Sequence, residues 1–256
     1  MIASFKTRRA TKDNLNFAKG IITSRMLLIK PLIRKVENKM ESEEEFKMPL
    51  LGDEAPDFEA QTSQGKLRLS DFKGSWLVMF SHPGDFTPVC TTEFMAFAEL
   101  AGELKKRNCE LLGLSVDSAP SHIAWVRNIE EKTGVKIPFP IIADGNKEVA
   151  KKYGMIHPGQ SATETIRATF IIDADGILRL ILYYPLTTGR NMQEILRCID
   201  ALQTADKHHV ATPANWKKGE KVIVPFPLDQ ESAEARLKEG YECIDWYLCK
   251  KELKKE

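Results

Sequence analysis

The pattern of apolar and polar positions predicts strands that alternate with helices. The apolar run over residues 76–80, within an expected strand 76–81, and the apolar-rich segment 110–116 are typical of strands buried on both faces. Apolar side chains recur on one helical face over residues 91–107 and again over residues 191–205. Strands and helices in this order predict an α/β fold.

Weaker signals predict the elements between these. A hairpin is expected over residues 57–69, and a second pair of strands, 168–173 and 177–183, is joined by the turn at Ala174-Asp175-Gly176. The other expected elements are short: a helix over 121–133, a strand over 140–143, a helix over 146–153 and a helix over 231–239.

Composition divides the chain into three parts. In residues 1–47, the stretch from Met1 to Val36 carries nine Lys or Arg against one acid, Asp13, and we expect this extension to be disordered. A basic targeting helix is the alternative. Residues 48–206 hold the periodic elements and form the main domain. Residues 207–256 contain too few apolar side chains for a core of their own, so this arm must pack on the main domain or on a partner subunit.

Overall composition excludes several classes of function. The 256 residues are 43% apolar and carry a net charge of +1, so nothing favours nucleic acid or an anionic membrane. No apolar run approaches the roughly 18 residues that span a bilayer. Five cysteines without a CxxC pair argue against a zinc site and indicate a reducing compartment. We therefore expect a cytoplasmic protein, or an organellar one if residues 1–36 are a transit peptide.

Cys90 is the residue with the clearest chemistry. It follows the predicted strand that ends at Ser81 and lies in the first turn of the next predicted helix. Unpaired N–H groups and the positive end of the helix dipole favour an anion at that position. A cysteine placed there is biased toward the thiolate, which is the nucleophilic form.

The spacing Pro83-x-x-x-Thr87-x-x-Cys90 resembles the active-site pattern of the peroxiredoxins. Further motifs resemble the 1-Cys-type and archaeal branch of that family: His82, Asp85-Phe86, Pro88 to Phe94, Arg167 to Asp173 and Thr187 to Asn191. The resemblance covers Met48 to Leu253. It implies a thioredoxin-like fold with a C-terminal dimerisation arm and a thiol peroxidase that needs no metal, haem or flavin.

The resemblance assigns roles to the residues around Cys90. Thr87 would donate a hydrogen bond to the thiolate or to bound peroxide, and Pro83 would fix the loop and shield the sulfur. Arg167 would point its guanidinium at Cys90 and polarise the O–O bond, and Arg190 matches a second active-site arginine that would bind substrate. A lower thiol pKa raises the fraction of thiolate but also makes that thiolate a weaker nucleophile, so it increases the reaction rate little. Donors aimed at the peroxide oxygens must therefore supply most of the rate enhancement.

Three further side chains are less specific. His82 is expected either to contact peroxide or to pack under the loop. Glu93 is expected to orient an arginine. His122 shows no metal-ligand spacing, and we expect it to be structural or exposed.

The cysteines other than Cys90 fall into two groups. Cys109 and Cys198 stand next to apolar patterns and are expected to be structural. Archaeal members of the resembled family carry a late pair like Cys243 and Cys249. That likeness implies that Cys249 of a partner subunit resolves the Cys90 sulfenic acid through an intermolecular disulfide, with Cys243 as a second exchange partner. The alternative is a one-cysteine enzyme whose sulfenic acid is reduced by an external thiol.

The resemblance also implies partners and leaves other functions to consider. It implies hydrogen peroxide or an organic hydroperoxide as substrate, a thioredoxin- or glutaredoxin-like reductant, and a homodimer that can form a decameric ring. An overoxidised ring acting as a holdase chaperone is an alternative function. Some 1-Cys relatives hydrolyse phospholipids through a Gly-x-Ser-x-Gly elbow, but here Lys73 and Leu77 stand where glycines are needed. The missing CxxC argues against a thioredoxin-like oxidoreductase.

Overall fold

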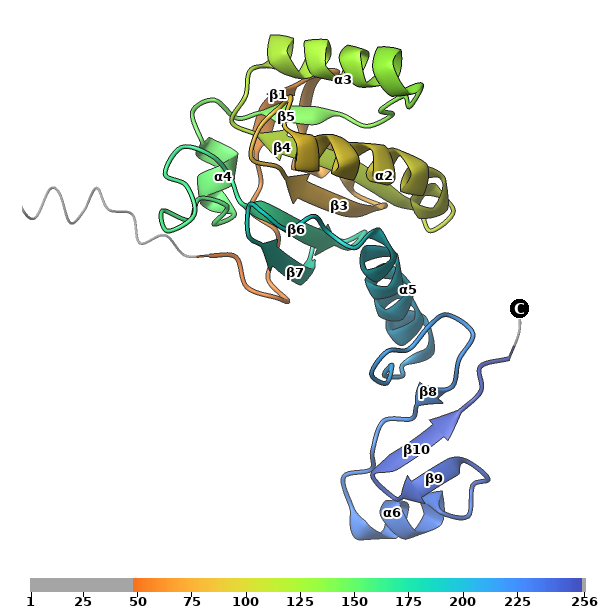
Figure 1. The fold of residues 1–256 in the computed structure, drawn as a ribbon. Helices are drawn as coiled ribbons and strands as arrows, with labels where there is room; N and C mark the ends of the chain where they lie inside the picture. Colours follow the sequence, from red (N-terminus) through yellow and green to blue (C-terminus); the bar gives the residue numbers. More distant parts are fainter. Residues whose placement is uncertain (1–47, 255–256) are drawn as a thin grey trace, which may run out of the picture. The chain divides into compact units, whose positions relative to one another are not determined.

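A mixed seven-stranded sheet forms the centre of the chain (Figure 1). The computed structural model describes residues 48–254, so the predicted extension over residues 1–47 lies outside the described residues. The strand order is β2-β1-β5-β4-β3-β6-β7. The bounds are β1 Glu59–Thr62, β2 Gly65–Arg68, β3 Trp76–Ser81, β4 Cys109–Ser115, β5 Ile141–Ala143, β6 Arg167–Ile172 and β7 Leu178–Tyr184. The three central strands β3, β4 and β5 are parallel, whereas β6 runs antiparallel to β3.

Helices cover both faces of this sheet, which confirms the predicted α/β fold (Figure 1). Their bounds are η1 Leu69–Phe72, α2 Pro88–Lys105, α3 Ala119–Thr133, α4 Glu148–Lys152 and α5 Met192–His208. One core packs α2, α3 and α5 against the face that carries Val78 and Phe80. A second core packs α4 against the opposite face, which carries Leu77 and Met79. Successive residues of β3 therefore enter different cores, which explains its unbroken apolar run.

Helix α2 begins earlier than its apolar pattern predicts. The pattern places the start at Thr91, whereas the helix starts at Pro88 with Thr87 as N-cap. Proline is favoured in the first turn because its missing N–H would have no partner there. The earlier start keeps Cys90 in the first turn.

The C-terminal arm contains more regular structure than the sequence indicates. It holds the helix α6 (Gln230–Arg236) and a three-stranded sheet in the order β8-β10-β9, namely Val222–Ile223, Leu248–Lys251 and Glu242–Asp245. The strands β9 and β10 were not predicted, because each is short and carries few apolar residues. A small cluster of Val210, Trp216 and Val222 packs against Ala201 of α5. Helix α5 itself runs past the expected boundary at residue 206.

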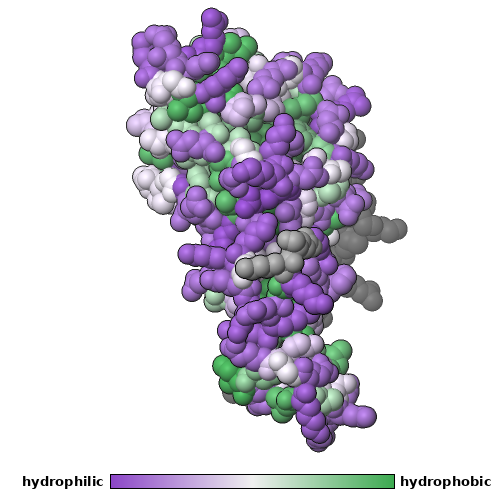
Figure 2. All heavy atoms as spheres, turned by 90° about the vertical axis from the view of Figure 1, so that its right-hand side faces the viewer, coloured by the Kyte–Doolittle hydropathy of each residue, from purple (hydrophilic) through white to green (hydrophobic). Residues whose placement is uncertain are grey.

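Part of the arm surface is apolar (Figure 2). Several large apolar side chains of the arm are exposed: Phe226, Leu228, Leu237, Ile244, Trp246 and Tyr247. Leu228 is 91% exposed and Ile244 is 79% exposed. No helix within residues 48–254 has both the length and the apolar character that crossing a membrane requires.

Candidate active site

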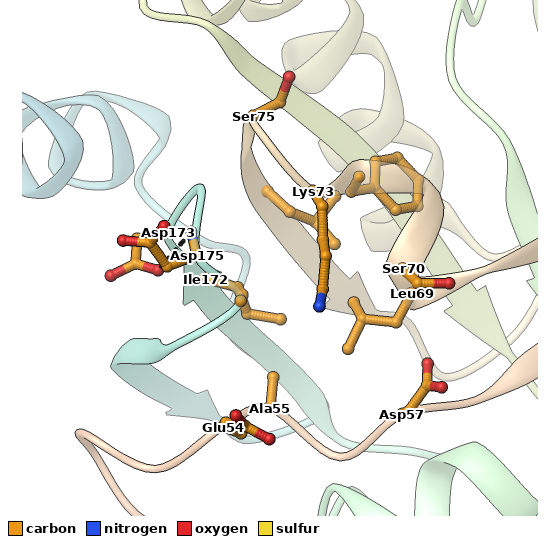
Figure 3. Close-up of a pocket in the computed structure, with 13 residues that line it drawn as sticks. Glu54, Ala55, Asp57, Leu69, Ser70, Lys73, Ser75, Ile172, Asp173 and Asp175 are labelled. Atoms are coloured by element: carbon orange, nitrogen blue, oxygen red, sulfur yellow. Dashed lines mark hydrogen bonds between the residues drawn. The ribbon is translucent and has the colours of Figure 1, made fainter.

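One cavity of about 220 Å³ lies away from Cys90 (Figure 3). Lys73 reaches across it, and acidic side chains including Asp57, Asp173 and Asp175 stand around it. Ser75 also lines it, but none of the described lining residues is a histidine. The Ser75 hydroxyl instead donates to Asn108 Oδ1 at 3.2 Å. A serine nucleophile needs a base at its hydroxyl, and in this structure the amide oxygen of Asn108 occupies that position at Ser75.

Cys90 is completely buried at the carboxyl end of β3. It is the third residue of α2, where backbone N–H groups have no carbonyl partner inside the helix. Those groups and the helix dipole favour a negative charge on the sulfur. The fold places Cys90 as the sequence predicts, at the junction of strand and helix.

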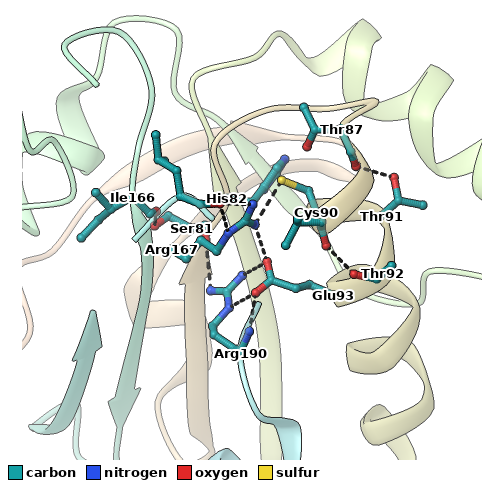
Figure 4. A network of polar contacts seen from close by, with 12 residues as sticks. Ser81, His82, Thr87, Cys90, Thr91, Thr92, Glu93, Ile166, Arg167 and Arg190 are labelled. Carbon is teal, nitrogen blue, oxygen red and sulfur yellow. Dashed lines mark hydrogen bonds and ion pairs between the residues drawn. The ribbon is translucent and has the colours of Figure 1, made fainter. Parts of the chain in front are cut away.

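Arg167 lies against the Cys90 sulfur (Figure 4). Its Nη1 donates to Cys90 Sγ at 3.3 Å, as the resemblance implied. Arg167 is the first residue of β6, which runs antiparallel to β3, so the start of one strand meets the end of the other. Its Nε and Nη2 both donate to the carbonyl of Leu186, at 2.9 and 2.8 Å. The guanidinium is therefore fixed with one N–H group aimed at the thiol.

Glu93 connects the two arginines of the site (Figure 4). Its carboxylate accepts from Arg167 Nη1 at 2.7 Å and from Arg190 Nε and Nη2, each at 2.8 Å. Burial alone would raise the pKa of Glu93, but the charges of Arg190 and Arg167 and the hydrogen bonds from Arg190 lower it below its ordinary value. Glu93 therefore orients arginines as an anion, in line with the sequence-based expectation.

Arg190 belongs to the same network of polar contacts, but its donors face the protein. Its side chain is fully buried, and Nη1 donates to the carbonyls of Ser81 and Ala168 at 3.0 and 2.9 Å. The rest of its guanidinium is held by Glu93. Because these protein acceptors hold it behind Glu93, we assign Arg190 to positioning Glu93 and correct the expectation that it contacts substrate.

The loop before Cys90 differs in one respect from the expectation. Pro83 is buried, as a residue that shields the sulfur would be. The Thr87 hydroxyl, however, donates to the carbonyl of Gly84 at 2.8 Å and not to Cys90. A hydroxyl has a single proton, so donation to a thiolate or a peroxide requires this bond to break. In the structure the Thr87 hydroxyl has already donated its proton to Gly84, so its oxygen can only accept a further hydrogen bond.

His82 packs under the loop, between aromatic rings. Its ring lies 4.8 Å from that of Phe94 and 5.1 Å from that of Trp125, measured between centroids. Its Nε2 is 2.9 Å from a carboxylate oxygen of Asp85, which also contacts His122. One possible metal-ligand atom from each of His82, Asp85 and His122 lies within 4.8 Å of the other two, close enough for a metal ion. Hydrogen bonds among the three side chains already account for the cluster.

Sequence reasoning missed this cluster. His122 was expected to be structural or exposed, and of these two alternatives the structure shows a fully buried side chain that is joined to the active-site loop. It stands 37 residues from Asp85 in the sequence, and no spacing rule connects the two. The only local sign was the acid at position 85 within the loop motif.

The C-terminal cysteines are joined to each other. Cys243 in β9 and Cys249 in β10 form a disulfide, and the register of these antiparallel strands places them opposite one another. Cys249 is buried. The predicted cross-link from Cys249 to Cys90 of a partner is therefore not the pairing in this structure, because the hairpin brings Cys243 directly beside Cys249.

Cys109 and Cys198 are buried free thiols. Burial raises the pKa of Cys109 to about 12 and that of Cys198 to about 11. A hydrogen bond to Glu194 contributes to the raised pKa of Cys198. Neither thiol forms much thiolate at neutral pH, which is the behaviour expected of structural cysteines.

The fold and the Cys90 site define a thiol-dependent peroxidase. The AhpC/TSA family matches residues 51–181, and the C-terminal domain of 1-Cys peroxiredoxin matches residues 201–240. A peroxiredoxin of Aquifex aeolicus is 62% identical over 217 residues, covering 80% of this chain and 98% of the relative. A peroxiredoxin of Methanosarcina mazei is 53% identical over 214 residues, covering 80% of this chain and 98% of the relative. The chain belongs to the peroxiredoxin family.

Solved structures agree with this assignment. A yeast mitochondrial 1-Cys peroxiredoxin superposes with a TM-score of 0.73 at 42% identity, covering 80% of this chain and 100% of that one. A reduced 2-Cys peroxiredoxin of Plasmodium vivax gives a TM-score of 0.65 at 34% identity, covering 73% of this chain and 98% of that one. The predicted thioredoxin-like fold is thereby confirmed.

Proposed function

We propose that Cys90 reduces hydrogen peroxide and small organic hydroperoxides, and that the C-terminal cysteine pair of a partner subunit returns it to the thiol. The observation that carries the proposal is the contrast between two sulfur sites. Cys90 is a free thiol with Arg167 Nη1 at 3.3 Å, whereas Cys243 and Cys249 form a disulfide. That disulfide is the end product expected if oxidation passes from Cys90 to the pair.

The cycle balances in four steps. The Cys90 thiolate attacks the terminal peroxide oxygen, the O–O bond breaks, and the alkoxide or hydroxide that leaves takes up a proton, giving Cys90–SOH and an alcohol or water. The Cys249 thiolate attacks that sulfur, the S–O bond breaks, and the hydroxide that leaves takes up a proton to give water, so a Cys90–Cys249 disulfide forms. The Cys243 thiolate then attacks Cys249 and frees Cys90 as a thiolate. A dithiol donor finally reduces the Cys243–Cys249 disulfide and is itself oxidised.

The donor is a thioredoxin- or glutaredoxin-like protein under this proposal. The similar yeast peroxiredoxin has its thiol resolved via glutathione/thioredoxin systems, which supports a small thiol protein or glutathione as reductant here. No electron carrier beyond thiols enters the four steps.

A homodimer is the proposed assembly, because the arm exposes apolar surface. Side chains such as Leu228 and Ile244 are 91% and 79% exposed, and a cluster of this kind marks an interaction site. Sedimentation velocity tests the dimer and any decameric ring formed from it. Ile244→Asp should shift the protein toward monomer, while Ile123→Asp, at a 43% exposed position of α3, should not. A monomeric wild-type protein would overturn this part of the proposal.

The cycle is tested by trapping its intermediates. The protein is reduced, freed of reductant, given one equivalent of hydrogen peroxide, alkylated, and mapped by non-reducing mass spectrometry. In the wild type we expect a Cys243–Cys249 peptide. In the Cys243→Ser variant the exchange stops one step earlier, so a Cys90–Cys249 peptide between subunits should accumulate. Cys198→Ser is the matched control and should behave as wild type.

Other outcomes point to other functions. Cys90 sulfenic or sulfinic acid, unchanged in amount by Cys249→Ser, would indicate a one-cysteine enzyme that uses an external thiol. A holdase chaperone would suppress aggregation of a client protein, and the Cys90→Ser variant would retain that activity. If Cys90 stays unmodified, the peroxidase function itself fails.

A further inference from the structure

The carboxylate of Asp85 lies between two buried histidine rings. His82 Nε2 is 2.9 Å from Oδ1 and His122 Nδ1 is 2.9 Å from Oδ2, and none of the three side chains is more than 2% exposed. Burial alone would raise the pKa of Asp85, but hydrogen bonds from His122 and His82 hold that pKa well below its ordinary range. Asp85 is therefore ionised and can only accept. Each ring nitrogen that faces it must carry a proton.

The second nitrogens of the two rings have different surroundings. His122 Nε2 lies 3.1 Å from the backbone carbonyl of Ile142, which can only accept, so this nitrogen is protonated too. Both ring nitrogens of His122 therefore face acceptors, a geometry that suits an imidazolium beside the Asp85 carboxylate. His82 Nδ1, in contrast, is buried and has no hydrogen-bond partner among the described residues. Burial lowers the pKa of His82, which makes it a neutral ring with its proton on Nε2 and a free lone pair on Nδ1.

The same aspartate anchors the loop that precedes Cys90. Its backbone N–H donates to Asp117 Oδ2 at 3.0 Å, and Asp117 is held in turn by the hydroxyl of Ser115 at 2.8 Å. The next residue, Phe86, has a φ of 56°, in the left-handed region that a large side chain rarely adopts. Such a conformation persists only where the surroundings fix it. The hydrogen bonds of Asp85 hold the chain in place directly before Phe86.

We propose that His122 is a positioning residue of the peroxidatic site. Its imidazolium holds the Asp85 carboxylate, which in turn keeps His82 in the Nε2–H form and holds the loop that carries Pro83 and Thr87. The arrangement is chemically like that of a catalytic triad, in which a buried aspartate selects the tautomer of its histidine. The inference rests on oxidation of Cys90 by peroxide, and it is independent of how the sulfenic acid is resolved.

Nitrogen-15 NMR of the histidine-labelled, reduced protein reads the ring protonation directly. At pH 7 His122 should show two protonated ring nitrogens, and His82 should show a protonated Nε2 with an unprotonated Nδ1. The wild-type signals that are absent from the spectrum of His122→Asn are assigned to His122. A neutral His122, or a His82 protonated on Nδ1, would overturn the inference. This measurement needs no peroxide, so its outcome is separate from that of the peroxidase assay.

Stopped-flow oxidation of Cys90 tests the positioning role. His122→Leu removes both donors and should lower the rate constant by about 10- to 100-fold, the usual effect of a misplaced catalytic group. His122→Asn keeps one N–H near the position of Nδ1 and should recover part of that loss. His157→Asn is the matched control, because the His157 ring contacts the Gly154 carbonyl and the Tyr183 ring and not the Asp85 cluster among the described residues.

A variant that does not fold leaves the test intact. If His122→Leu is unfolded, Asp85→Asn replaces it, because the amide keeps the shape and can present either an oxygen or an N–H group to His82. We then expect the His82 signals to report a mixture of tautomers and the rate constant to fall. A wild-type rate constant together with an unchanged His82 spectrum in Asp85→Asn would overturn the proposal.

Discussion

Replacing Glu93 by glutamine should damage both stability and catalysis. The carboxylate accepts hydrogen bonds from Arg167 Nη1 at 2.7 Å and from the Nε, Nη2 and backbone N of Arg190 at 2.8, 2.8 and 2.9 Å. Glu93→Gln keeps the shape but removes the charge and turns an acceptor into an N–H group that faces donors. Breaking a buried ion pair costs about 3–5 kcal/mol, so we expect the free energy of unfolding at pH 7 to fall by about that amount.

The catalytic effect follows from the position of Arg167. Its Nη1 contacts both Glu93 Oε2 and Cys90 Sγ, so the substitution removes a restraint on the group that stabilises the thiolate. Two hydrogen bonds to the Leu186 carbonyl remain and keep the guanidinium near the site. A displacement of about 1 Å can cost roughly 100-fold, so we expect the rate constant of Cys90 oxidation to fall by about 10- to 100-fold.

Urea unfolding and stopped-flow oxidation measure the two effects. Glu103→Gln is the matched control, because this side chain is 44% exposed and pairs with Lys106 and Arg107 at the surface. Exposed pairs contribute about 0–1 kcal/mol, and the control should stay within that range. The ion-pair reasoning is refuted if Glu93→Gln matches Glu103→Gln in unfolding free energy and in the rate of Cys90 oxidation.

Three further predictions concern acid, the inert thiols and the cavity. The fold holds the pKa values of Glu93 and Asp85 below their ordinary values, so their stabilisation is present above about pH 4.5 and is lost as the pH falls through the folded values. Urea midpoints should therefore fall less between pH 5 and about pH 2.5 in Glu93→Gln and Asp85→Asn than in the wild type. Because burial raises the pKa of Cys109 to about 12 and that of Cys198 to about 11, peptide mass spectrometry after excess peroxide should find both unoxidised, and oxidation of either would contradict their structural role. Ser75→Ala removes a hydrogen bond of 3.2 Å and should cost about 1 kcal/mol with no change in peroxide reduction; a loss of activity would indicate that the cavity takes part.

Local pattern was sufficient for the elements that build the sheet. The apolar run at residues 76–80 and the helical stripe over 191–205 identify β3 and α5, because burial of a strand or of a helix face depends on side chains that are close in sequence. The same reasoning placed Cys90 at a helix start. Resemblance added Arg167, whose approach to the sulfur depends on β6 pairing with β3 and could not be read from local pattern.

Tertiary structure decided which side chains meet around that framework. Asp85 contacts His122 although 37 residues separate them in the sequence. Arg190 is buried and paired with Glu93, and the register of a hairpin joins Cys243 to Cys249. Each of these contacts depends on how loops converge at the end of a sheet or on how two strands align. Hydrophobic periodicity specifies which face of an element is buried, but it carries no information about which distant polar group lies opposite. The sequence alone therefore determined the fold class and the nucleophile, while the packed structure determined the network that holds the nucleophile in place.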